Sequence, residues 1–243
     1  MKTTYWKYLP LLLICLILPL SLQAGWGAGI RGSNHDFSGS SWNTAGENPG
    51  EICRVCHAPH DRGLDMWLGS EAGLLWNHEM STASYTMYTS ESLAGSIEGQ
   101  PTGRSKLCLS CHDGTVAIDA FDGRPGGGED MMMDYAFGGR LVVPSPRAAK
   151  DGDNLDLRSH HPISVQYIDN VKIGKAGGLH DPDDATYYDS NKVARFLEFG
   201  RVECHSCHDV HDVSAVPQTQ LLRAGTNIAI SAPSALCLTC HNK

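Results

Sequence analysis

The sequence predicts a loop-built fold, mostly coil with short helices and few strands, that lacks a conventional hydrophobic core. Composition is the first reason: the 243 residues include 26 Gly and 12 Pro, which interrupt regular elements, and only 7% are aromatic. The second reason is that no long amphipathic helical pattern runs through the chain, so no helix is expected to bury a continuous apolar face. A chain of this length therefore needs another source of core.

That source is indicated by a short pattern, Cys-x-x-Cys-His, which occurs four times. This is the attachment signature of haem c, in which the two thiols bond to the haem vinyl groups and the adjacent His ligates the iron. We therefore expect four haem c and the fold class of a multihaem cytochrome c, with a haem stack replacing a conventional core and folding coupled to haem insertion. The expected thioether residues are Cys53, Cys56, Cys108, Cys111, Cys204, Cys207, Cys237 and Cys240, and the expected proximal iron ligands are His57, His112, His208 and His241.

Disulfide bonds and zinc binding are the two alternatives to haem attachment for these cysteines. A disulfide framework explains an even number of cysteines in an exported chain, but not the regular spacing or the His that follows each pair. Zinc sites built from paired Cys-x-x-Cys motifs usually separate the pairs by about 15–20 residues. Here 51 residues separate Cys56 from Cys108, and 29 separate Cys207 from Cys237. Covalent haem is the interpretation that accounts for all four histidines.

The first residues have the pattern of an export signal, with Lys2 and Lys7 before an apolar run and a cleavage site after Ala24. The run is shorter than the ~20 residues that span a bilayer, so no transmembrane segment is expected after signal removal. Haem c is attached outside the cytoplasm, which agrees with export. Without the two lysines, 17 basic residues face 27 acidic ones. Such an acidic chain is not expected to bind nucleic acid.

The motifs divide the chain into two similar halves. Residues 53–60 and 204–211 both read Cys-x-x-Cys-His-x-x-His, and each is followed by a Leu-Cys-Leu-x-Cys-His copy that starts at Leu107 or Leu236. A short helix is expected to carry the last copy. The predicted organisation is a signal peptide at 1–24, an extended N-terminal arm at 25–50, a first haem pair at 51–122, a flexible Met- and Gly-rich loop region at 123–154, and a second haem pair at 155–243.

Each haem iron needs a sixth ligand unless it binds a substrate, and eight of the twelve histidines are not part of a motif ending. His60 and His211 follow a proximal His by three residues, too few to reach the far side of the same haem. We expect His60 to serve the second haem and His211 the fourth. His161 is a further candidate because Pro162 holds it in an extended conformation. His35 and His78 are equal alternatives for the remaining position.

Several blocks of sequence resemble the doubled-CXXCH cytochromes of metal-reducing bacteria, and more narrowly the OmcE-type tetrahaem cytochromes. The blocks are His35–Ser38, Cys56–His60, Leu75–His78, Leu107–Thr115, His161–Ser164 and Cys207–His211. The resemblance implies a haem-cored subunit in which every iron has two His ligands. It also implies that subunits stack into extracellular filaments that conduct electrons, with one His ligand contributed across the subunit boundary. The loop at 123–154 has no counterpart in the resemblance.

The expected function is therefore electron transfer, without enzymatic activity, as the repeating subunit of an extracellular conductive filament. The expected partners are copies of the chain arranged head to tail, and redox partners or extracellular metal acceptors. An arm that carries His35 and few apolar residues could reach the neighbouring subunit, and His78 could fill the same role. A soluble periplasmic shuttle, a multihaem reductase with a five-coordinate haem and a subunit of a membrane complex are the open alternatives.

Overall fold

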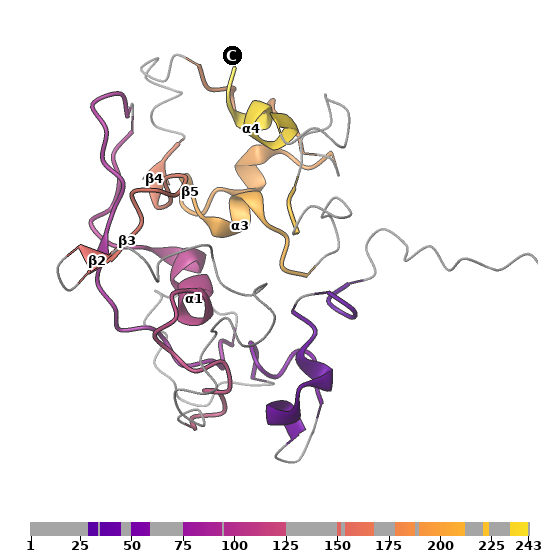
Figure 1. Ribbon diagram of the computed structural model, residues 1–243. Helices are drawn as coiled ribbons and strands as arrows, with labels where there is room; N and C mark the ends of the chain where they lie inside the picture. The colour runs from indigo at the N-terminus through magenta and orange to yellow at the C-terminus, as the bar shows by residue number, and fades with distance from the viewer. Residues whose placement is uncertain are drawn as a thin grey trace, which may run out of the picture.

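The computed structural model describes residues 29–33, 35–44, 50–58, 75–93, 95–124, 150–151, 154–167, 178–187, 190–211, 221–223 and 234–242. The expected signal peptide, His60 and the Met run of the 123–154 loop lie outside these residues. Within the described part, regular elements are short and are joined by turns and irregular segments (Figure 1). None of the described helices is long and apolar enough to cross a membrane.

Three α-helices carry motif residues. Helix α1 spans Gly103–His112, α3 spans Cys204–Cys207 and α4 spans Ser234–Cys240. The glycine that begins α1 has φ +48° and lies against the Glu198 carboxylate, which accepts a hydrogen bond from the Arg104 N–H at 2.9 Å. A carboxylate at this end of a helix is favourable because it faces the positive end of the helix dipole. In Figure 1, α3 lies between α1 and α4.

The strands form two small sheets. Strands β1 (Tyr85–Thr86), β3 (Asn154–Asp156) and β2 (Lys150–Asp151) lie in that order, with β1 parallel and β2 antiparallel to β3. The second sheet pairs β4 (Val165–Gln166) with β5 (Arg201–Val202). Residues 198–201 form a tight turn before the third motif, and the strand that follows this turn pairs with β4.

Buried apolar side chains of the described residues form three small clusters. One surrounds Tyr187 and Val193, and Val193 is the first residue of 3-10 helix η6 (Val193–Phe196), which precedes the third and fourth motifs in the sequence. Another surrounds Val55 and Phe121 near the first two motifs, and the third lies around Leu109 and strands β1 and β3. The clusters adjoin motif residues: Cys56 and Cys111 pack against the second one, and Cys240 against the first.

The N-terminal segment differs from the extended arm that was expected. It contains two 3-10 helices, η2 (Phe37–Gly39) and η3 (Ser41–Thr44). Phe37 is buried in the cluster with Val55 and Phe121, and Asn43 is buried with its amide donating to the carbonyls of Phe37 and Glu51. Apolar packing and these hydrogen bonds hold the segment against its own chain, which is why it does not extend away.

Candidate metal centres

Three of the four motifs share one backbone turn. The amide N–H of the motif His donates to the carbonyl of the first motif Cys in the first, third and fourth copies, at 2.8, 3.0 and 2.8 Å. The second copy lies in the last turns of α1. One helical turn places residues three apart on the same face. The two cysteines of each motif therefore lie on one side of the turn, as attachment to one planar group requires.

The eight motif cysteines are free thiols, and those of neighbouring motifs lie close together. The thiols of Cys108 and Cys204 lie close enough to shift each other's pKa, which is raised at Cys108 and lowered at Cys204, so the second motif lies beside the third. Burial, and then the nearby Cys56 thiol, raise the pKa of Cys111. Burial, and then the nearby Cys240 thiol, raise the pKa of Cys207 to about 12. These contacts link the four motifs in the order of the sequence.

Three motif histidines each face a second histidine from elsewhere in the chain. The ring centroids of His57 and His211 are 6.3 Å apart, those of His112 and His35 are 5.9 Å apart, and those of His241 and His161 are 6.3 Å apart. We call these the three histidine pairs. Their interplanar angles differ, at 16°, 58° and 69°, but their separations fall within a narrow range.

The separations fit one metal atom between each two rings. A metal held at about 2.0 Å from two imidazole nitrogens places the ring centroids roughly 6 Å apart, because each centroid lies about 1 Å behind its nitrogen. Two thiols on one side of a turn, followed by a paired His, are the donors that a covalently attached haem requires. The residues therefore fit haem c at the first, second and fourth motifs.

Burial keeps the pair between α1 and the N-terminal segment neutral. It lowers the pKa of His112 to about 4, with further contributions from His35 and His208, and it is also the main cause of the lowered pKa of His35. The Nδ1 atoms of both rings are buried without a hydrogen-bond partner. A neutral imidazole is the form that ligates a metal, so this pair needs no proton loss before binding.

The structure places His211 differently from the expectation. His211 faces His57 of the first motif instead of the fourth motif, because Asp209 accepts a hydrogen bond from the His211 N–H at 3.2 Å and turns the chain there. His35 lies opposite the second motif, and the pairing expected for His60 lies outside the described residues. The fourth motif faces His161. His208 of the third motif lies close enough to His35 and His112 to lower the pKa of both.

His78 has a different environment from the paired histidines. It is 3% exposed, and its Nδ1 and Nε2 atoms lie 2.9 and 3.3 Å from the carbonyl oxygens of Glu79 and Ile118. Both nitrogens thus face backbone oxygens, which indicates a structural role. The preceding Asn77 has such a role too, since its amide donates to the Arg54 carbonyl and to the Asp122 carboxylate.

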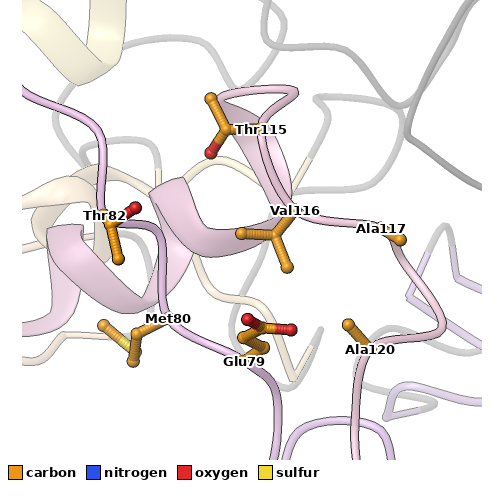
Figure 2. A pocket seen from close by; sticks show the side chains of 7 residues that line it. All are labelled: Glu79, Met80, Thr82, Thr115, Val116, Ala117 and Ala120. Carbon is orange, nitrogen blue, oxygen red and sulfur yellow. The ribbon is translucent and has the colours of Figure 1, made fainter. Parts of the chain in front are cut away.

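No cluster of three or more His, Cys, Asp or Glu side chains able to hold a metal ion occurs among the described residues, the motif residues included, so each candidate centre consists of a histidine pair and the motif thiols. A hollow of about 200 Å³ lies beside the loop that follows α1 (Figure 2). Its lining includes Glu79, Thr82 and Thr115 but neither a motif Cys nor a paired His.

Sequence reasoning missed the charged side chains that hold the motifs in place. Glu203 is buried directly before the third motif, the ion pair Arg223–Asp209 is buried, and the ion pair Arg54–Asp122 is partly buried. Only the position of Asp209, directly after His208, gives a local signal. Comparison with other proteins adds no family: no family model matches the chain, and no curated protein is significantly similar to it.

Proposed function

We propose that this chain is a tetrahaem c-type cytochrome that transfers electrons from haem to haem and is not an enzyme. The observation that carries the proposal is the set of three histidine pairs, each joining a motif His to a His from a distant segment at 5.9–6.3 Å. A disulfide framework gives no reason for such pairs. A zinc site needs four ligands in one cluster, and a thiol–His motif facing a single distant His is a different arrangement.

In this proposal the motif thiols would hold each haem by thioether bonds, and the three histidine pairs would ligate the irons at the first, second and fourth motifs. Haem supplies one-electron uptake and release when bound. An iron with two His ligands has no free position for a substrate, which argues against reductase chemistry at these three motifs. A second His ligand for the third motif is a prediction from the sequence. Replacing Met by His as an axial ligand also favours a low potential.

The close approach of the motif thiols supports transfer along the whole chain. Cys56 lies near Cys111, Cys108 lies near Cys204, and Cys207 lies near Cys240. Groups attached at these thiols would follow one another in the order of the motifs.

Self-assembly into an extracellular filament stays a prediction from the sequence. Its proposed link was a His35 side chain that reaches a neighbouring subunit, and His35 instead faces His112 of its own chain. His78, the other candidate, has both ring nitrogens against backbone carbonyls. The proposal therefore rests on electron transfer within one chain, and a soluble carrier fits these contacts without further assumptions.

The test is the intact mass of the protein after denaturation, when only covalently attached groups remain. We expect four haem masses above the polypeptide, and three in the double variant Cys108→Ser, Cys111→Ser. As a control, His180→Ala changes a His outside the motifs and the pairs and should keep all four. A denatured mass equal to that of the polypeptide alone would refute the proposal.

A further inference from the structure

We propose that Arg223 and Asp209 are positioning residues that hold two candidate ligands of different haems, His208 of the third motif and His211 opposite the first. The inference rests on the proposed function. It adds that one buried ion pair controls the geometry of two centres together.

Arg223 donates hydrogen bonds to backbone carbonyls of the third motif. Its backbone N–H donates to the Cys207 carbonyl at 2.8 Å, and its Nε donates to the carbonyls of His205 and His208 at 3.2 and 3.3 Å. The guanidinium carbon lies 4.0 Å from the centre of the Phe196 ring, and the residue is only 9% exposed. A buried guanidinium with several donors in a rigid fork fixes the groups that accept from it.

Asp209 extends this arrangement from the third motif to the first. Its Oδ1 lies 3.3 Å from an Arg223 terminal nitrogen and accepts the His211 N–H at 3.2 Å. Its own N–H donates to the Leu221 carbonyl at 2.7 Å. The same carboxylate oxygen thus links the Arg223 side chain to the backbone of His211, whose ring faces His57.

The physical consequence follows from burial. Asp209 is 4% exposed, so removing either partner leaves a charge in a poorly solvated place, and the surrounding turn must move to hydrate it. That turn carries His208 and His211. We therefore expect changes at the first and third centres, while the His112–His35 and His241–His161 pairs, which lie on other elements, keep their geometry.

The experiment compares low-temperature EPR spectra and redox titrations of the complete haem protein with those of Arg223→Gln. We expect two of the four low-spin ferric signals to change g value and two midpoint potentials to shift, with the others unmoved. Arg195→Gln is the matched control, because exposed Arg195 lies over the same Phe196 ring at 5.9 Å and donates its hydrogen bond to Asn191 and not to the motif turn. It should reproduce the native spectrum.

Variants at Asp209 separate its two contacts. Asp209→Asn keeps an oxygen for the His211 N–H but leaves the Arg223 charge without this carboxylate, so the same two signals should change. Asp209→Ala also removes the acceptor of the His211 N–H and should change both signals by more. If Arg223→Gln fails to fold, the two Asp209 variants test the inference, again by which low-spin EPR signals change. Four unchanged signals in a protein that carries four haems would overturn this inference alone, whereas native protein without haem would overturn the proposed function as well.

Discussion

The first and third motifs have the same sequence pattern, Cys-x-x-Cys-His-x-x-His, but the chain holds them differently. The first lies in turns and is anchored by Arg54, a residue inside the motif. Its partner Asp122 lies 68 residues further along the chain, after the second motif. The third contains helix α3 and is anchored by Arg223, which comes from outside and pairs with Asp209 next to the motif His. Each guanidinium also lies over a Phe ring, Phe121 or Phe196.

The difference indicates which parts of the molecule depend on each other. Asn77 donates to the Arg54 carbonyl at 2.5 Å and to Asp122 at 2.9 Å, so the first motif is joined to the loop behind the second. The Arg223–Asp209 pair lies near the third motif in the sequence, and the Cys204 N–H of that motif also donates to the Ser105 hydroxyl of α1 at 2.9 Å. The repeated pattern therefore sets the local turn, while the position of each motif relative to the others is set by contacts outside the pattern.

The largest expected effect is at the first motif. Asp122→Ala leaves the Arg54 guanidinium without its buried partner, and the two side chains are only 11% and 7% exposed in the native protein. We expect the free energy of unfolding to fall by roughly 3–5 kcal/mol. Guanidinium denaturation followed by circular dichroism measures this.

The corresponding change at the third motif should be smaller. In Asp209→Ala, Arg223 keeps the His205 and His208 carbonyls and the Phe196 ring, so about 2 kcal/mol is expected. Equal losses in the two variants would contradict the comparison between a distant anchor and a local one.

A second contrast between the first and third motifs is the glutamate that precedes each of these two, Glu51 and Glu203. Glu203 is 1% exposed and accepts hydrogen bonds from the hydroxyls of Thr102, Ser105 and Ser164 at 2.8, 2.5 and 3.1 Å, whereas Glu51 is exposed. Glu203→Ala should cost about 3 kcal/mol because three buried hydroxyls lose their acceptor. Glu51→Ala is the matched control and should stay within about 0.5 kcal/mol of the native value.

The buried glutamate also predicts a pH dependence of stability. Burial raises the pKa of Glu203 above its ordinary value of 4.5, so the folded protein holds this proton more tightly than the unfolded chain. Stability from this group is therefore present below the ordinary pKa and is lost as pH rises through the raised one. Denaturation curves of Glu203→Gln across this range should lack that decline. A decline of the same size in both proteins would exclude Glu203 as its source.

Sequence reasoning located what is local and missed what depends on tertiary contacts. The four motifs and the helix at Ser234–Cys240 follow from patterns within a few residues. The partner of His211 differs from the expectation because its direction depends on the Asp209 turn, and the partner of Arg54 lies 68 residues away. The N-terminal segment was expected to extend because burial of Phe37 depends on Val55 and Phe121, which no local pattern connects to it.

The smallest effect concerns the turn that leads into the third motif. Phe199 and Gly200 have φ +50° and +76°, and the Phe199 side chain is 57% exposed. Two positive φ values are typical of a type I′ hairpin turn, for which Asn-Gly is preferred. Phe199→Asn should therefore raise the free energy of unfolding by about 1 kcal/mol, measured by guanidinium denaturation. A loss of stability would mean that the Phe199 ring contributes packing that its exposure does not suggest.

The central claim is that histidines of the same chain complete the iron coordination, and low-temperature EPR of oxidised His35→Ala tests it most directly. In the native protein we expect only low-spin ferric signals. In the variant we expect one high-spin ferric haem per chain, at every protein concentration, because His112 loses the partner that lies 5.9 Å away. A variant that stays entirely low-spin, or a native protein that already contains high-spin haem, would contradict the account.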